Sequence, residues 1–561
     1  MGFGGSDLKV RFGDIHVAYF SMEIGIDGQI PTYSGGLGIL AGDFLRSAAD
    51  LNIPIMGITL LYKKGFFNQK LIDGMQSEEE VSWNPKEHME QLPNRVTVMI
   101  QGRTVQVEAW LYVLKGILGS IPIIFLNTDL PENSEYDRTI THKLYANDDY
   151  YRFCQEIVLG IGGFRMLEAL GISPQKFHMN EGHSALLTLE LCKRFPGSDM
   201  IKQVRKMCVF TTHTPVPAGH DQFSIQTVDS VLGDIIPEKL RRDIFFNDKL
   251  NMTYLGLVFS EFINGVAKKH GEISRGMFPG YTIESITNGV HSGFWTSEPF
   301  RILYDKYIPG WERDPFSLRY ALGIPGKEFW KAHQEAKKIL IDYIKRKYGV
   351  AFDLQTFTLG FARRAATYKR GDMLFSDMNR LKMIAKKHKI QIVYGGKAHP
   401  KDLEGKKIIK KVIDDMAELK DSVKCVYIEN YDLNVAKMIV SGVDVWLNTP
   451  LRPLEASGTS GMKAAHNGVP QFSVLDGWWL EGHVENFTGW SIGPHPDQSK
   501  ESNPAWDVED LYGKLEYIIL PAYYTNLAHW TTIMRHCIAI NASFFNTHRM
   551  LQQYVLDAYF K

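Results

Sequence analysis

Two patterns of hydrophobic positions alternate along most of the chain. Short apolar runs, rich in β-branched side chains, are followed by longer segments in which apolar positions recur every three or four residues. The short runs predict buried strands, and the longer segments predict amphipathic helices. Strands that alternate with helices form parallel sheets covered by helices, so the pattern predicts an α/β fold.

The alternation occurs twice, with a Gly-, Thr- and Ser-rich segment between the two series. The first series predicts strands at 16–23, 53–62, 121–127, 176–180 and 207–212, and helices at 36–51, 147–170 and 183–194. It also predicts an antiparallel hairpin of 95–100 and 105–114. The second series predicts strands at 356–361, 391–396, 423–430 and 444–449, and helices at 373–388, 406–419, 433–440 and from 460.

These series predict two doubly wound, Rossmann-like domains that face each other across a cleft. The expected domains are 1–288 and 289–561, with a hinge at 279–295. Residues 506–561 show only helical periodicity, and this segment is long enough to cross back to the first domain.

The composition of the chain excludes several classes of protein. Lys plus Arg and Asp plus Glu are equal at 63 each, which gives no general argument for nucleic-acid binding. The 44% apolar and 22% charged residues exclude a disordered chain. The five cysteines are scattered without a CxxC pair, and no signal peptide or membrane span is readable. We therefore expect a cytoplasmic protein.

A glycine-rich loop at Ser34–Gly38 opens the first predicted helix. Consecutive glycines at a helix start expose backbone N–H groups to an anion. The alternative is a turn that serves only tight packing between strand and helix. A glycine-rich loop alone does not decide between the two.

A second Gly/Ser/Thr-rich helix start lies at 455–463 and ends in Lys463. An amine in the first turn of this helix could condense with an aldehyde. The alternative is a solvated helix lysine, which is the commoner environment for a lysine.

Four cations occur within eight residues after the strand at 356–361, namely Arg363, Arg364, Lys369 and Arg370. Lys397 follows the next strand in the same way. Ligands of open α/β sheets bind at such strand ends, so clustered cations there predict a phosphate site. The alternative is a solvated basic turn.

Polar groups also lie at 180–183, 212–215 and 287–291, and include His183, His213 and His291. Each histidine alone is more typical of a hydrogen-bonded structural residue than of a catalyst. No HExxH helix or other recognised ligand spacing is present, so we expect no metal site.

Taken in order, these segments resemble the α-glucan phosphorylases, which act on glycogen, starch and maltodextrin and have the two-domain GT-B fold. The matching motifs cover nearly the whole chain and lie at 19–23, 34–38, 180–183, 213–214, 264–267, 287–289, 368–370, 395–397, 429–431, 455–463 and 546–550. Many collinear motifs are far more specific than any one of them.

The resemblance implies an enzyme that uses pyridoxal 5′-phosphate and inorganic phosphate to release α-glucose 1-phosphate from a glucan, with retained configuration. Lys463 matches the lysine that holds the cofactor covalently. The other residues matched to the cofactor are Tyr19, Gly36, Arg363, Lys369, Tyr431 and Thr459. Those matched to catalysis or to substrate are Gly35, Gly36, His213, Asn288, Arg364, Lys369, Glu455, Ser457 and Gly458. The resemblance also implies a homodimer.

The chain departs from the animal and plant pattern at several positions. Arg363 replaces a usual Lys, residues 365–367 are Ala-Ala-Thr, and Gly461 replaces a common Asn. The chain also begins almost at the first strand, so we expect control through an N-terminal extension to be absent. These features resemble the shorter microbial branch of the family.

Two other functions compete with this hypothesis. A glucan synthase of the same fold would use a nucleotide sugar, for which we find no purine or ribose contacts. A catalytically silent glucan-binding protein would bind glucan without the absorption band of bound pyridoxal phosphate.

Overall fold

The computed structural model describes residues 13–145, 148–216, 219–236, 238–498 and 503–561. The chain forms two compact units. Unit 1 comprises Met1–Phe67, Glu80–Thr287 and Met550–Lys561, and unit 2 comprises Asn68–Glu79 and Asn288–Arg549. The units are therefore not two contiguous halves, although the chain does pass from unit 1 to unit 2 between Thr287 and Asn288.

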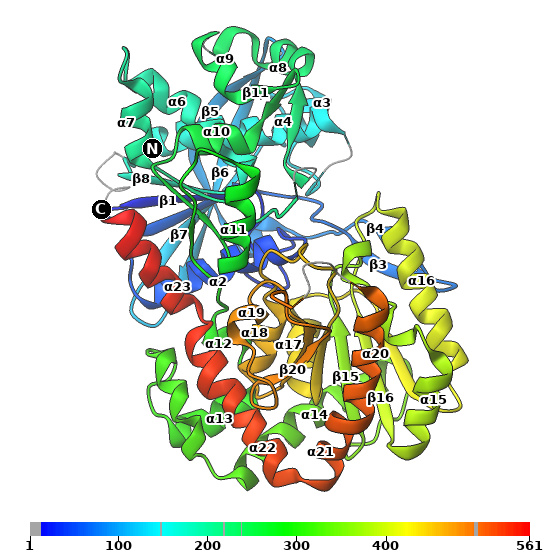
Figure 1. Ribbon diagram of the computed structural model, residues 1–561. Helices are drawn as coiled ribbons and strands as arrows, with labels where there is room; N and C mark the ends of the chain where they lie inside the picture. Colours follow the sequence, from blue (N-terminus) through cyan, green and yellow to red (C-terminus); the bar gives the residue numbers. More distant parts are fainter. Residues whose placement is uncertain (1–12, 146–147, 217–218, 237, 499–502) are drawn as a thin grey trace. The chain divides into compact units, whose positions relative to one another are not determined.

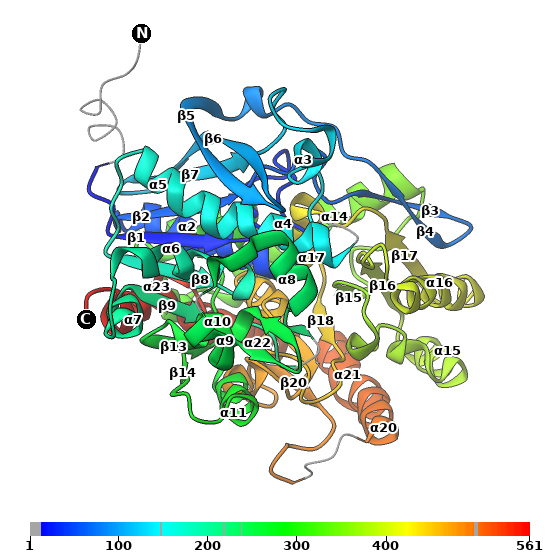
Figure 2. The ribbon, with the colours of Figure 1, turned by 90° about the horizontal axis from the view of Figure 1, so that it is seen from above.

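A nine-stranded sheet forms the centre of unit 1, in the order β14-β13-β9-β8-β1-β2-β7-β6-β5. Neighbouring strands from β14 to β7 are parallel, whereas β6 and β5 are antiparallel additions at one edge (Figure 2). The strands are β1 (Val17–Ser21), β2 (Ile55–Leu60), β5 (Glu90–Ile100), β6 (Arg103–Lys115), β7 (Ser120–Asn127), β8 (Lys176–Asn180), β9 (Cys208–Thr211), β13 (Phe262–Gly265) and β14 (Glu284–Ser285).

Both faces of this sheet are buried, as its continuous apolar strands require. On β1, Ala18 and Phe20 enter one hydrophobic core, while Val17 and Tyr19 enter another. The main helices are α2 (Gly36–Asp50), α4 (Asp149–Ile157), α5 (Gly163–Ala169), α6 (Leu187–Arg194), α7 (Met200–Met207), α8 (Ile225–Leu232), α9 (Glu238–Ile244), α10 (Met252–Val258) and α11 (Lys268–Met277).

Unit 2 contains a six-stranded, fully parallel sheet in the order β17-β16-β15-β18-β19-β20. Counted along the chain, this is the order 3-2-1-4-5-6 of the Rossmann fold. The strands are β15 (Phe357–Ala362), β16 (Ile390–Gly395), β17 (Lys424–Ile428), β18 (Val445–Asn448), β19 (Gln471–Val474) and β20 (Gly489–Ile492). The strand order reverses between β15 and β18, and ligands of such sheets bind at this point.

Helices surround the sheet of unit 2 (Figure 1). They are α12 (Ser292–Trp295), α13 (Glu298–Tyr307), α14 (Gly326–Tyr348), α15 (Met378–Lys387), α16 (Leu403–Glu418), α17 (Leu433–Gly442), α18 (Ser460–Ala465), α19 (Trp479–Gly482), α20 (Pro504–Lys514), α21 (Leu520–Thr525), α22 (Leu527–His536) and the start of α23 (Thr547–Tyr554). A separate hairpin of β3 (Asn68–Ile72) and β4 (Met75–Glu79) also belongs to this unit.

The structure confirms the two series of strands and helices and the antiparallel hairpin, which becomes β5 and β6. Several parts of the fold lay outside the sequence-based prediction, among them the strands β13, β14, β19 and β20 and the helices α7, α11, α13 and α14. Two of the unpredicted parts are antiparallel. One is the β3–β4 hairpin, whose inward side chains are polar. The other is the small antiparallel sheet of β10 (Gln222–Ser224), β11 (Phe245–Phe246) and β12 (Lys249–Asn251) in unit 1.

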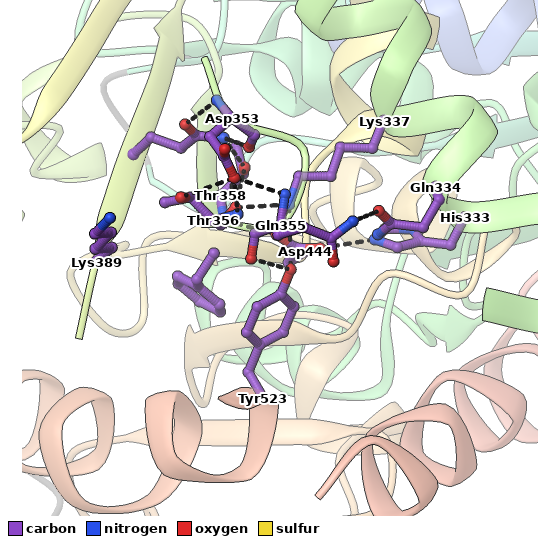
Figure 3. A network of polar contacts seen from close by, with 12 residues as sticks. His333, Gln334, Lys337, Asp353, Gln355, Thr356, Thr358, Lys389, Asp444 and Tyr523 are labelled. Carbon is purple, nitrogen blue, oxygen red and sulfur yellow. Dashed lines mark hydrogen bonds and ion pairs between the residues drawn. The ribbon is translucent and has the colours of Figure 1, made fainter. Parts of the chain in front are cut away.

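A buried polar network lies at the start of β15 and β18 in unit 2 (Figure 3). Asp444, just before β18, accepts hydrogen bonds from Lys337 Nζ at 2.6 Å and from the backbone N–H of Thr358 at 2.7 Å, and it contacts His333 Nε2 at 2.7 Å. Each charge is therefore paired, as a buried charge must be. Because this network lies at the amino ends of the strands, opposite to the usual ligand edge, we interpret it as structural.

Among the described residues, no helix is long and apolar enough to cross a membrane.

Candidate functional site

The basic segment predicted from the sequence follows β15 and lies at the switch point of unit 2. Arg370 ties this segment to the loop after β18, because its guanidinium donates to Thr449 O at 2.8 Å and to Pro450 O at 2.9 Å. It also pairs with the buried Asp507 at 2.8 Å. Arg370 therefore holds the two loops together, and the other three cations remain candidates for an anion.

The carboxylate of Glu455 lies between two of these cations. It accepts hydrogen bonds from Arg363 Nη2 at 2.6 Å and from Lys369 Nζ. Burial alone would raise the pKa of Glu455, but the two positive charges lower it to about 2. The carboxylate is therefore ionised at neutral pH. Arg364, by contrast, is exposed.

The loop between β18 and α18 carries three further predicted residues, Ser457, Gly458 and Thr459. Ser457 is 4% exposed, and its hydroxyl has no hydrogen-bond partner although it is buried. Gly458 has a φ of 74°, a conformation that favours glycine. Arg363 Nη1 is another buried donor without a partner. Unsatisfied buried donors of this kind are costly unless a ligand occupies them.

Lys463 is buried on α18, and its Nζ lies 4.1 Å from the centre of the Trp295 ring. Because Lys463 is only 7% exposed, it is not a solvated helix lysine. Trp295 was not among the predicted site residues, because only the fold brings α12 beside α18. The aromatic ring beside the Lys463 amine marks Trp295 as a site residue, and only the structure shows this contact.

Three other residues of unit 2 lie at loop positions near strand ends. Tyr431 follows β17, and its Cδ2 atom would lie 3.5 Å from a Cβ at Gly395, the last residue of β16. Lys397 follows the same strand, and burial lowers its pKa to about 8 against the opposing charge of Asp432. Asn288 is buried, and its carbonyl accepts a hydrogen bond from Arg549 at 3.0 Å.

Asp476 is a residue of this region that sequence analysis did not identify. Its carboxylate accepts backbone hydrogen bonds from Glu455 and Gly477, each at 2.9 Å. Burial and then the nearby charge of Glu455 raise its pKa to about 7, despite these hydrogen bonds. Asp476 thus fixes the backbone of the residue that pairs with the basic segment.

In unit 1, the glycine-rich loop begins α2 as predicted, with Gly36 as its first residue. The carboxylate of Glu23 accepts hydrogen bonds from the backbone N–H groups of Ser34 at 2.5 Å and Gly35 at 3.2 Å. The loop therefore does bind an anionic group in this structure, and that group is a side chain of the same unit.

His213 lies after β9 in unit 1 and is held by the last residue of β8 and by the residue that follows it. Its Nε2 contacts Asn180 Oδ1 at 2.6 Å, and its backbone N–H donates to Glu181 Oε2 at 2.7 Å. Burial lowers the pKa of His213 to about 4, so its ring is neutral near pH 7.

Tyr19 lies in the core of unit 1 rather than in a loop. Its ring stacks on Phe44 at 4.7 Å and meets the edge of His178 at 4.9 Å, and the residue is 2% exposed. The structure therefore does not group Tyr19 with the glycine-rich loop. It groups the predicted residues of unit 2, in contrast, around the ends of β15 to β18.

Comparisons with known proteins show the family to which this chain belongs. The family model described as carbohydrate phosphorylase matches residues 31–111 and 238–485. Maltodextrin phosphorylase of Thermococcus litoralis is 40% identical over 97% of this chain and 70% of its own length. Glycogen phosphorylase of Aquifex aeolicus is 32% identical over 97% of this chain and 86% of its own.

A third relative matches the length of this chain. An uncharacterized protein of Methanocaldococcus jannaschii is 32% identical over 97% of this chain and 99% of its own length. Because the family model covers more than half of the chain and several relatives exceed 30% identity, the chain belongs to the carbohydrate phosphorylase family.

Proposed function

We propose that this protein is a pyridoxal-phosphate-dependent α-1,4-glucan phosphorylase, which uses inorganic phosphate to release α-glucose 1-phosphate from a glucan or maltodextrin. One observation carries the proposal: a buried lysine, Lys463, lies in the short helix α18 after the switch point, and the loops at that point carry Arg363, Lys369 and Glu455. The names of the relatives support the same activity.

The residues of unit 2 fit the cofactor that this family uses. Lys463 provides a buried amine against an aromatic ring, and the unpartnered donors of Ser457 and Arg363 provide groups for phosphate oxygens. We assign Lys463, Arg363, Lys369, Tyr431 and Thr459 to the cofactor, and from unit 1 we add Gly36 and Tyr19. When bound, pyridoxal phosphate supplies a phosphate group that exchanges a proton with the substrate phosphate.

Substrate phosphate requires cations, because charge-assisted hydrogen bonds to a phosphate are strong. We assign Arg364 and Lys369 to this role, together with the backbone N–H groups of Gly35 and Gly36. Such cations hold a phosphate whose hydroxyl can protonate the departing glycosidic oxygen as a general acid. The same cations then place a phosphate oxygen beside the anomeric carbon, which explains retention of configuration.

The sugar is held by uncharged and anionic groups. We assign Asn288, Glu455, Ser457 and Gly458 to the glucosyl hydroxyls, and His213 to the position beside the anomeric carbon. A neutral His213 adds no charge that would oppose an oxocarbenium-like transition state.

At the level of architecture we propose the GT-B fold. Counted along the chain, the parallel strands of unit 2 follow the order 3-2-1-4-5-6, and those of unit 1 follow the same order with β14 added as a seventh strand, so each unit has a Rossmann-like topology. We also propose a homodimer, on the resemblance alone.

The decisive experiment is to incubate the protein with maltodextrin, inorganic phosphate and pyridoxal phosphate, and to assay glucose 1-phosphate. We expect product in the wild type, none in Lys463→Ala, and product in the exposed-lysine control Lys331→Ala. Binding of maltodextrin without product or the cofactor absorption band would support a silent glucan-binding protein instead. Glucosyl transfer from a nucleotide sugar would support a synthase.

A further inference from the structure

The β3–β4 hairpin packs on the part of unit 2 that carries Lys397. It lies beside α16, as Figures 1 and 2 both show. Glu78 of β4 pairs with Lys406 of α16 at 2.7 Å. The hairpin interrupts unit 1 in sequence and yet belongs to unit 2, so its contacts with unit 2 must be specific enough to hold it there.

Two glutamines provide those contacts. Gln69 and Gln76 are 1% and 4% exposed, and Gln69 Nε2 donates to Gln76 Oε1 at 2.9 Å. The Gln76 amide also accepts from Ala398 N and donates to Ala398 O, each at 2.9 Å. The Gln69 amide donates to Gly396 O at 2.9 Å and accepts from Asn430 N at 2.9 Å.

These hydrogen bonds fix the backbone on both sides of Lys397. One glutamine binds the residue before it, and the other binds the residue after it with both its donor and its acceptor. An apolar anchor would bury comparable area but would not fix the register of this loop, because hydrophobic contacts are not directional. A fully satisfied buried amide network does fix it.

The same loop supports the basic segment after β15. The N–H of Ala365 donates to Lys397 O at 2.9 Å. Gly396 has a φ of 141°, and a Cβ at this position would lie 1.9 Å from Arg363 O, so the two loops touch through their backbones. A shift of the loop at 396–398 would therefore displace the cations that follow β15 as well as Lys397.

We infer that Gln69 and Gln76 are positioning residues, which hold Lys397 in place to bind a phosphate group. The inference rests on the proposed function, because that function supplies two phosphates, one inorganic and one on the cofactor. Lys397 is half-buried, which agrees with this role, since a partly dehydrated ammonium binds an anion more strongly.

The experiment is a double-mutant cycle on the holoenzyme, read by calorimetric titration with inorganic phosphate. Gln76→Met removes all hydrogen bonds of the amide at nearly constant volume. We expect it to raise the phosphate Kd about ten-fold, which corresponds to the loss of one to two hydrogen bonds, and to leave the maltodextrin Kd within about two-fold. Lys397→Met should raise the phosphate Kd by a similar factor.

Adding Gln76→Met to Lys397→Met should then raise the phosphate Kd by less than about two-fold, because residues that act through one another are not additive. Lys70→Met is the matched control, since Lys70 lies on the exposed face of the same hairpin. It should change neither Kd. Gln69→Met provides a second variant if Gln76→Met folds poorly.

The inference would be overturned by additive effects in the double variant. It would also be overturned if both glutamine variants kept the wild-type phosphate Kd and a normal cofactor content. Cofactor content, measured by absorbance after release, separates the two sources of phosphate. A loss of cofactor with an unchanged Kd for inorganic phosphate assigns the positioning to the phosphate of the cofactor. The cycle measures binding, so it stands even if the wild type forms no glucose 1-phosphate, the result that would refute the proposed function.

Discussion

In this structure, Glu455 forms ion pairs with the cations that the proposed reaction needs for phosphate. Its carboxylate pairs with both Arg363 and Lys369, and its low pKa shows that the negative charge is retained near neutral pH. A phosphate that reaches these cations must therefore share them with Glu455. We expect the carboxylate to substitute for phosphate while the site holds none.

This exchange predicts the behaviour of Glu455→Gln. Removing one partner of a buried ion pair leaves uncompensated charge and costs roughly 3–5 kcal/mol, so the variant should unfold at a lower temperature in phosphate-free buffer. Inorganic phosphate should restore the balance of charge and raise its Tm more than that of the wild type. Glu509→Gln, at an exposed pair with Arg380, is the control. An equal phosphate response in both variants would contradict the exchange.

Buried histidines predict acid sensitivity. Burial lowers the pKa of His178 to about 3 and of His213 and His270 to about 4. The unfolded value is about 6.5, so the unfolded chain binds the extra protons. Stability from these residues is therefore complete above about pH 6.5 and falls as the pH drops toward 4, by roughly 1.4 kcal/mol per pH unit for each histidine.

Urea unfolding between pH 7 and 5 tests this expectation. The free energy of unfolding should fall with pH, and His178→Gln should reduce the slope by up to about 1.4 kcal/mol per pH unit, the contribution of one histidine. A free energy that is constant or rises toward pH 5 would show that these rings are protonated in the folded state.

At the scale of elements, most strands and helices were predictable because their burial is apolar and periodic. The parallel strands β15 and β16 are continuous apolar runs, and α17 has a clear amphipathic period. The β3–β4 hairpin was not predictable, because its buried positions are Gln69 and Gln76 and its exposed positions include apolar residues. In this hairpin polar side chains are buried and apolar side chains are exposed, the reverse of the usual pattern of a strand. The reason is that the hairpin packs on backbone polar groups instead of a hydrophobic core.

The candidate site was predictable to a similar degree. Motifs located Lys463 and the basic segment, because glycine-rich helix starts and clustered cations are local in sequence. Trp295 and Asp476 were not found, because each acts through a neighbour that only the tertiary fold supplies. The assignment of Tyr19 to the cofactor rests on the resemblance and stays a proposal; in the structure the Tyr19 ring stacks on Phe44.

Helix α2 gives a prediction about packing. A Cβ at Gly42 would lie 1.9 Å from Gly25 O, a backbone atom that cannot rotate away. Gly42→Ala should therefore destabilise the protein by about 3 kcal/mol, despite the better helix propensity of alanine. Gly276→Ala in α11, where no atom lies within 4 Å of the added Cβ, should be neutral or stabilising by up to about 1 kcal/mol. Thermal unfolding of both variants checks the contrast.

At the scale of the whole molecule, the last residues of the chain complete the core of unit 1. Tyr554 OH contacts Thr211 Oγ1 at 3.0 Å and accepts from Asn264 Nδ2 at 2.8 Å. Tyr559 OH contacts His178 Nδ1 at 2.5 Å. Both tyrosines are at most 3% exposed. Unit 1 thus depends on a segment, Met550–Lys561, that follows unit 2 in the sequence.

We therefore predict that a chain ending at residue 549 has a selectively weakened unit 1. Deleting residues 550–561 removes two buried aromatic rings, and truncation of each such ring costs about 3–5 kcal/mol. It also removes the tyrosine partners of the Thr211 hydroxyl and the His178 ring. Amide hydrogen exchange should accelerate in β8 and β9 of unit 1, while β15 and β16 of unit 2 keep their protection. Tyr554→Phe in the full chain, which keeps the ring and loses the hydroxyl, should give a smaller change confined to the same strands. Equal acceleration in the strands of both units would mean that the chain unfolds as one cooperative body, and that its end stabilises the whole molecule rather than unit 1.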